Sequence, residues 1–232
     1  MENKNQVFFL HFAGGSSSSY NFLSKFIRNA EVHQLELPGR GNRFAEPFVP
    51  DIEAAIEDYT RQIINRLNNR SFAVFGHSMG ALIAIHVIKR LERLHHFSKR
   101  LIVSGNSGPG IKHEHSQKRY LMDTDDFLSE LRKIGGMPAA FFQHQGLINH
   151  FSPIIKSDFK IIEEQEKTIL GPVNTPIFAI IGNREKEVKK IFNWRKFTNA
   201  DFQYKVFEGG HFFIHEHKAE VAELINESFA ES

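Results

Sequence analysis

The sequence of 232 residues contains no cysteine. Disulfide bonds are therefore excluded, and nothing in the composition points to an oxidising compartment. Long apolar runs are also absent: no stretch approaches the ~20 apolar residues that a membrane-spanning helix needs. The first residues lack the apolar core of a signal peptide. These absences predict a soluble protein of the cytoplasm with no membrane partner.

An excess of charge of one sign is missing as well. The chain has 29 lysines and arginines against 27 acidic residues, and the two signs are interspersed. Nucleic-acid binding needs a dense positive surface, so the charge gives no reason to expect that partner. The triplets 113–115 and 215–217, each His-Glu-His, lack the ligand spacing of zinc sites. We therefore expect no metal ion and no resident cofactor.

Strand and helix patterns alternate along most of the chain. Apolar segments predict strands at 7–12, 32–37, 71–75, 100–104, 175–181 and 202–207. Helical spacing of apolar residues falls between them, at 20–28 and 51–68, after 80, and at 216–229. Such alternation predicts an α/β fold with a mainly parallel sheet covered by helices on both faces. The length is typical of one domain, spanning residues 1–232.

Residues 106–170 interrupt this alternation. They carry helical patterns at 125–134 and 159–168 but no convincing strand. A long excursion between two strands, at the carboxyl side of a parallel sheet, is where a lid over a site lies. We predict a helical lid insertion over 106–170. Extra helical packing with no gating role is the alternative.

The most informative motif is Gly76-His77-Ser78-Met79-Gly80. An apolar strand pattern precedes it and a helical pattern follows, which is the context of a G-x-S-x-G nucleophile elbow. Glycines flank the serine because a sharp turn crowds the neighbouring backbone. The helix that follows directs its free N–H groups toward negative charge at Ser78. The motif predicts that Ser78 is a nucleophile.

A serine nucleophile needs a base, and the base needs an orienting acid. At an elbow of this kind, the chain order is serine, acid, histidine. His211 comes after the last predicted strand, behind two glycines, and is our candidate base. His77 is adjacent to the serine but is expected to point elsewhere. The acid should follow the 175–181 strand, where residues 182–187 contain no aspartate. Glu185 is the candidate, Glu187 the alternative, and an acid from elsewhere a third possibility.

Attack on a carbonyl creates an oxyanion, which needs hydrogen-bond donors fixed in advance. The backbone N–H of Met79, directly after the nucleophile, is one expected donor. The second should come from the loop after the first strand, where Ala13 or Gly14 is suitably placed, and we choose Ala13. The glycines of this loop do not form a P-loop, because the lysine and following Ser/Thr of that motif are missing.

Taken together, these motifs resemble the type II, stand-alone editing thioesterases that accompany nonribosomal peptide and polyketide synthases. The resemblance covers nearly the whole chain. It departs from the family at Glu185, where aspartate is usual. The matching segments are His11-Phe12-Ala13-Gly14-Gly15, Leu35-Glu36-Leu37-Pro38-Gly39-Arg40-Gly41, Gly76 to Ala81, Val103-Ser104-Gly105, Gly135-Gly136-Met137-Pro138, Ser157-Asp158-Phe159 and Gly209-Gly210-His211-Phe212-Phe213.

The resemblance implies an α/β-hydrolase fold and hydrolysis of acyl or aminoacyl thioesters. The substrates would be carried on phosphopantetheine arms of acyl or peptidyl carrier protein domains, the expected partners of a monomeric enzyme. Ser78 would attack, His211 would relay the proton, and Met79 and Ala13 would hold the oxyanion. A small-molecule carboxylesterase on the same scaffold is the alternative enzyme. A hydrolase-like binding protein that has lost catalysis is the alternative from another class.

Overall fold

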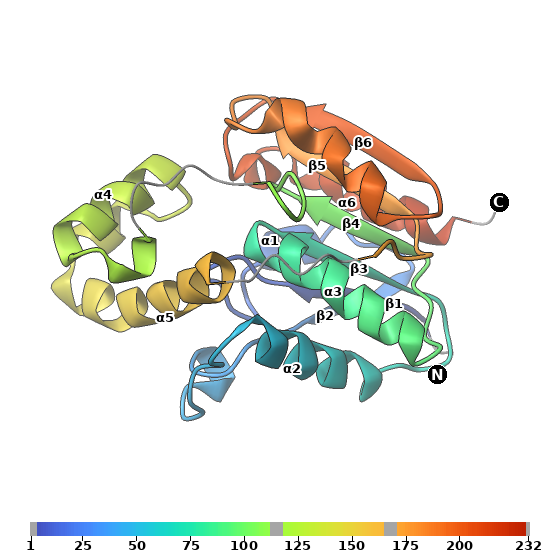
Figure 1. Ribbon diagram of the computed structural model, residues 1–232, viewed down its shortest axis with the longest axis horizontal. Coiled ribbons are helices and arrows are strands. Elements are labelled where there is room, and N and C mark those ends of the chain that lie inside the picture. The colour runs from blue at the N-terminus through green and yellow to red at the C-terminus, as the bar shows by residue number, and fades with distance from the viewer. Residues whose placement is uncertain (1–3, 112–117, 165–170, 231–232) are drawn as a thin grey trace.

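The computed structural model describes residues 4–111, 118–164 and 171–230 (Figure 1). Its centre is one sheet of six strands in the order β2-β1-β3-β4-β5-β6, with every neighbouring pair parallel. The predicted α/β fold is confirmed. The strands are β1 (Asn5–Leu10), β2 (Ala30–Gln34), β3 (Phe72–His77), β4 (Arg100–Ser104), β5 (Ile177–Gly182) and β6 (Phe202–Phe207).

Helices cover both faces of the sheet. Alternate residues of β1 point to opposite sides: Phe8 and Leu10 join the cluster under α2 (Ile52–Ile64) and α3 (Met79–Arg93). Val7 and Phe9 join the cluster under α1 (Asn21–Ser24) and α6 (Lys218–Asn226). Because both faces are buried, the central strands contain runs of consecutive apolar residues, such as 7–10 in β1 and 72–75 in β3, instead of alternating with polar residues.

The strand order places an opening at the carboxyl ends of β1 and β3. These strands are neighbours, but β1 leads to α1 on one face and β3 leads to α3 on the other. The two connections diverge, and parallel sheets bind their ligands in the crevice that such a divergence leaves. The loop after β1 and the turn after β3 therefore frame the candidate site.

Some element boundaries differ from those predicted. The helix expected at 20–28 ends at Ser24, and Asn29 has a φ of 60°, a left-handed conformation that a helix does not continue through. The strand expected at 32–37 lies at Ala30–Gln34. The final helix expected at 216–229 is α6, followed by a 3₁₀ turn at Glu227–Phe229. The paired strands and their order are unaffected.

Two helices, α4 (Thr124–Ile134) and α5 (Gln145–Glu163), lie together beyond the end of the sheet where α3 begins (Figure 1). They share an apolar cluster of their own that includes Phe127, Leu131 and Phe159. The helix predicted at 159–168 was placed too late. Pro153 lies inside α5, and proline is usually a helix terminator, but the apolar face of α5 packs on both sides of it. Residues 165–170 lie outside the described residues.

Within the described ranges, no helix has both the length and the apolar character that crossing a membrane requires. The longest is α5, with 19 residues, and it carries polar and charged side chains along its length. Ile148, Ile155 and Phe159 of α5 are buried in the cluster that this helix shares with α4.

Substitution of Gly80 is predicted to damage the fold severely. A Cβ atom at Gly80 would lie 2.2 Å from the carbonyl oxygen of Leu10, so α3 would have to move away from β1. We expect Gly80→Ala to lower the free energy of unfolding by about 3 kcal/mol or more, as for other overpacked cores. Urea denaturation measures the change. Gly146→Ala in α5 is the matched control, because no heavy atom lies within 4 Å of its added Cβ. Equal effects at the two glycines would contradict the prediction.

Candidate active site

Ser78 occupies the turn between β3 and α3. Its backbone has φ 55° and ψ −115°, a conformation that non-glycine residues adopt only where the surroundings enforce it. Its N–H donates to the carbonyl of Ser104 on the neighbouring strand, with an N···O distance of 2.8 Å. A Cβ at Gly76 would lie 2.3 Å from the Gly80 carbonyl oxygen, so the two flanking glycines permit the turn. The predicted strand–turn–helix is present.

His211 and Glu185 are brought together from the ends of two adjacent strands. Glu185 follows β5, and His211 follows β6. The Nδ1 atom of His211 lies 2.8 Å from Glu185 Oε2, and Glu185 Oε1 accepts from the Gly182 N–H at 3.2 Å. This carboxylate favours the tautomer with the proton on Nδ1, which leaves Nε2 free to accept a proton. Both side chains are partly buried, with 21% and 13% exposed.

Glu187, the alternative acid, is engaged elsewhere. Its carboxylate pairs with Lys190 Nζ at 2.5 Å, and its carbonyl accepts from the Ser107 hydroxyl at 2.9 Å. The structure therefore brings Glu185, and not Glu187, to the candidate base.

The loop that carries His211 lies against the elbow. The rings of His211 and His77 have centroids 4.9 Å apart. The next ring along, Phe212, is 5.4 Å from His77 and 5.0 Å from Phe12 in the loop after β1. The loops after β1, β3 and β6 thus converge at the crevice that the strand order creates.

The side chain of His77 is fully buried. Its Nδ1 atom lies 2.8 Å from the Ser104 hydroxyl, while its Nε2 atom has no hydrogen-bond partner among the described residues. Burial, followed by the nearby imidazoles of His211 and His215, lowers the pKa of His77 well below its usual value. A neutral ring therefore lies beside His211. This contact was not predicted from the sequence.

Two backbone donors border the crevice. Within residues 4–111, 118–164 and 171–230, neither the Ala13 nor the Met79 N–H donates to a protein acceptor. Met79 is the first residue of α3, and the first N–H groups of a helix have no partner inside it. The Gly14 N–H, in contrast, donates to Asp158 Oδ2 at 2.7 Å. Among the described residues, the Ala13 N–H therefore has no protein acceptor, whereas the Gly14 N–H has one.

The segment between α4 and α5 contacts the same site. Gly136 has a φ of 82°, and a Cβ there would lie 2.2 Å from the ring of Phe212. The backbone of the predicted lid therefore packs directly on the residue that follows His211. The importance of Phe212 was missed from the sequence, because it contacts three segments that are distant in the sequence, those of Phe12, His77 and Gly136.

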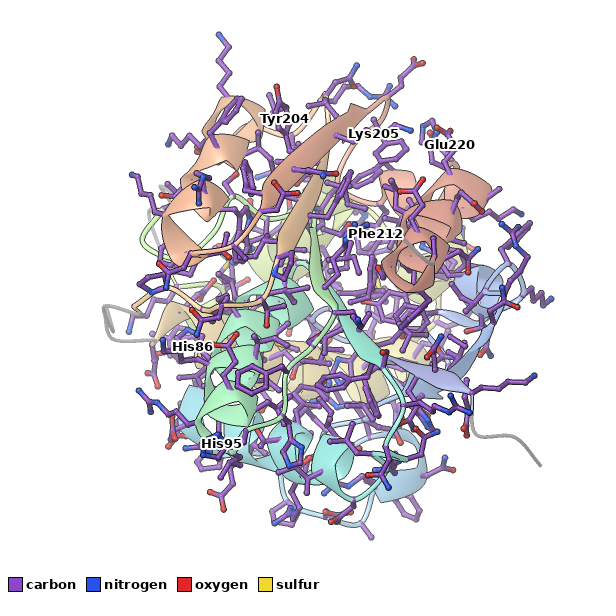
Figure 2. All side chains as sticks on the ribbon, turned by 90° about the vertical axis from the view of Figure 1, so that its right-hand side faces the viewer. His86, His95, Tyr204, Lys205, Phe212 and Glu220 are labelled. Atoms are coloured by element: carbon purple, nitrogen blue, oxygen red, sulfur yellow. The ribbon has the colours of Figure 1, made fainter. Side chains whose placement is uncertain are left out.

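Other histidines lie elsewhere. Figure 2 shows His86, in α3, and His95, just after it, well apart from Phe212. His217 pairs with Glu220 at 2.9 Å and with the carbonyl of Glu208. In the part of the chain that the structure describes, no group of three His, Asp or Glu residues is arranged to hold a metal ion. The triplet 113–115 lies outside the described residues.

Comparison with known proteins gives one family. The model of the thioesterase domain matches residues 5–229. Linear gramicidin dehydrogenase LgrE of Brevibacillus parabrevis is 30% identical over 226 residues, covering 94% of this chain and 85% of the relative. Gramicidin S biosynthesis protein GrsT of Aneurinibacillus migulanus is 30% identical over 96% of this chain and 88% of its own. The type II thioesterase BorB from the borrelidin biosynthetic cluster superimposes with a TM-score of 0.88, at 25% identity over 99% and 94% of the two chains.

One of these names, that of LgrE, denotes a dehydrogenase. The Gly-x-Gly-x-x-Gly fingerprint of dinucleotide-binding folds follows none of the strands here. After β1, where that fingerprint belongs, the sequence is His11-Phe12-Ala13-Gly14-Gly15.

A second buried histidine supports the loop after β1. His11 Nδ1 donates to the Phe12 carbonyl at 2.9 Å, and its Nε2 accepts from the Leu37 N–H at 3.3 Å. Burial, together with the positive charge of Arg40, lowers the pKa of His11 to about 4. The ring is neutral in the folded protein at pH values where it would be protonated in the unfolded chain.

The free energy of unfolding should therefore decrease as the pH is lowered, and His11 contributes to this decrease between its unfolded and folded pKa values. Above pH ~6.5 both states hold His11 neutral; between about 6.5 and 4 only the unfolded state gains a proton, so the free energy of unfolding decreases. The full shift corresponds to about 3 kcal/mol. We expect His11→Asn, which keeps a donor for Phe12, to reduce the slope of unfolding free energy against pH in this window. Urea denaturation at a series of pH values measures it; an unchanged slope would contradict the assignment.

Proposed function

The chain belongs to the thioesterase family, and from this premise we propose that Ser78, His211 and Glu185 are its catalytic triad. The observation that carries the proposal is the 2.8 Å contact between His211 Nδ1 and Glu185 Oε2 beside the strained turn of Ser78. The N–H groups of Met79 and Ala13 form the oxyanion hole. Their support is that both lie at the crevice and are left free by the surrounding hydrogen bonds.

The proposed reaction proceeds in two halves. The Ser78 hydroxyl attacks the thioester carbonyl carbon while His211 Nε2 accepts its proton, and Glu185 stabilises the imidazolium. The oxyanion of the tetrahedral intermediate is held by the two N–H groups. His211 then protonates the sulfur as the C–S bond breaks, releasing a thiol and leaving an acyl-serine. Water, activated by His211, attacks that ester, and the free acid leaves as Ser78 recovers its proton.

The substrate in this proposal is an acyl or aminoacyl group on the phosphopantetheine arm of a carrier protein domain. Removal of such groups would regenerate a stalled or misprimed nonribosomal peptide or polyketide synthase. The support comes from the relatives: GrsT is named a gramicidin S biosynthesis protein, and BorB is a type II thioesterase from the borrelidin biosynthetic cluster. The enzyme is proposed to act as a cytoplasmic monomer, with no resident cofactor, because the pantetheine arm comes from the partner.

Residues 1–232 are proposed to act as a single domain in which residues 106–170 form a lid. Two features support a lid. Helices α4 and α5 have an apolar cluster separate from those of the sheet, and Gly136 rests on Phe212 beside His211. A pantetheine arm that reaches Ser78 would pass under this segment.

The proposal is tested by acetate release from an acetylated carrier protein. Wild type should release acetate, and Ser78→Ala should reduce kcat by about 10⁴-fold or more, because the nucleophile is removed. A fluorophosphonate should label wild type at Ser78 and leave the variant unlabelled. Faster turnover of a free acetyl ester than of the acetylated carrier protein would favour a carboxylesterase. Folded wild type that neither turns over substrate nor is labelled would refute the triad.

The identity of the acid has its own test. Glu185→Gln should lower kcat for acetyl-carrier hydrolysis by about 10²- to 10⁴-fold, since the amide no longer fixes the tautomer of His211 or stabilises its positive charge. Glu187→Gln is the matched control two residues away, and should change kcat by less than about 3-fold, because Glu187 pairs with Lys190. The reverse order of the two effects would show that Glu187 is the acid.

A further inference from the structure

A buried ion pair joins the predicted lid to the body of the protein. Arg40 lies in the turn at residues 38–41, and Asp158 lies on α5. Arg40 Nη1 donates to Asp158 Oδ2 at 2.6 Å, and Nη2 donates to Oδ1 at 2.7 Å. The side chains are 2% and 0% exposed. Neither residue belongs to the proposed triad or to the oxyanion hole.

An ion pair buried this deeply contributes little net free energy to folding. Taking both charges out of water costs several kcal/mol per ion, and apolar residues of similar volume often serve the fold equally well. The helix α5 already has an apolar face that includes Ile148 and Phe159. The carboxylate of Asp158 has a third contact, with the loop after β1, and this contact indicates a role other than stability.

Asp158 also holds the loop that follows β1. Its Oδ2 atom accepts from the Gly14 N–H at 2.7 Å, in addition to the bond from Arg40. Arg40 Nη1 donates to the Gly15 carbonyl at 3.3 Å, so both members of the ion pair form hydrogen bonds with this loop. Gly14 has a φ of 77°, and a Cβ there would lie 2.7 Å from Ile155 Cγ1. The loop is thus pressed directly onto α5.

We propose that Asp158 is a positioning residue that completes the oxyanion hole from the lid. This inference rests on the proposed function, in which Ala13 supplies one oxyanion donor. The Ala13 N–H belongs to the Phe12–Ala13 peptide, whose carbonyl accepts from the Gly15 N–H at 2.9 Å. Asp158 holds the Gly14 N–H and Arg40 the Gly15 carbonyl, so together they hold the turn that sets the direction of the Ala13 N–H. The loop contains two glycines and four serines in succession, a composition that does not hold one conformation without external anchors.

A consequence is that catalysis depends on the position of α5. With α5 seated, Asp158 engages Gly14 and the hole is complete. Movement of α5 away from the body would remove the acceptor from Gly14 and release the loop. A bound acyl group that displaces α5 would then be hydrolysed slowly. An acyl group that binds while α5 keeps its contact with Gly14 would be hydrolysed rapidly. The geometry therefore links the fit of the acyl group to the rate of hydrolysis.

Two variants separate positioning from stability. Arg40→Met with Asp158→Leu replaces the pair by apolar side chains, which restores a neutral, packed interior but leaves Gly14 without an acceptor. Asp158→Asn keeps an oxygen for Gly14 but leaves the buried charge of Arg40 unpaired. The double variant should therefore be the more stable protein in urea denaturation, and Asp158→Asn the better catalyst.

We expect kcat for acetyl-carrier hydrolysis to fall about 10- to 100-fold in the double variant, less than the 10²- to 10³-fold typical of losing an oxyanion donor outright. Asp158→Asn should stay within about 3-fold of wild type, and KM should change little in either. The trifluoromethyl ketone analogue of acetyl-pantetheine, which forms an oxyanion on Ser78, should bind the double variant more weakly by the same factor as kcat. The amide analogue, which forms none, should bind equally to all.

Glu92→Gln supplies the matched control. Glu92, at the far end of α3, is also a buried carboxylate that accepts from a backbone N–H, that of Asn174 at 2.8 Å. Glu92→Gln should lower the free energy of unfolding and leave kcat and both inhibitor affinities unchanged.

If kcat follows stability across all variants, or if the double variant keeps wild-type kcat, the positioning role is overturned. If Asp158→Asn does not fold, the test is the comparison of kcat between the double variant and Glu92→Gln. Wild type without turnover or Ser78 labelling would instead refute the proposed function.

Discussion

The close approach of α3 to β1 is the constraint on which the rest of the site depends. Gly80 lies against the Leu10 carbonyl with no room for a side chain, so the first turn of α3 is fixed beside the end of β1. That contact places Ser78 and the Met79 N–H next to the loop that carries Ala13. The strand order β2-β1-β3 makes the contact possible, because it sets these two strands side by side and sends their connections to opposite faces.

Charge around the crevice is sparse and locally balanced. The histidines nearest the elbow and the loop after β1, His77 and His11, are held neutral by burial. Arg40 is matched by Asp158, and Glu185 faces His211. In the proposed mechanism, fixed N–H dipoles would face the developing oxyanion, as in preorganised sites that stabilise acyl-transfer intermediates. The proposed chemistry therefore relies on backbone geometry more than on net charge.

Local patterns in the sequence predicted most of the sheet and much of the candidate site. Burial on both faces gives β1, β3 and β5 runs of consecutive apolar residues, so these strands were found from the sequence. Ser78 and His211 follow β3 and β6, so the parallel sheet places both at its carboxyl edge. What escaped prediction depends on contacts between distant segments. Arg40 and Asp158 are far apart in sequence, and α5 continues through Pro153 because of packing against α4. His77 and Phe212 gained their significance only from neighbouring rings.

The backbone conformation of Ser78 has a consequence for the evolution of related sequences. A non-glycine residue at φ 55° and ψ −115° costs of the order of 1–3 kcal/mol, and selection for folding alone does not reward it. In a descendant that no longer needed hydrolysis, glycine at this position would relieve the backbone while the elbow, sheet and helices persisted. Duplicated copies that have turned to other tasks should accordingly be marked by the loss of this one side chain before any wider change in sequence.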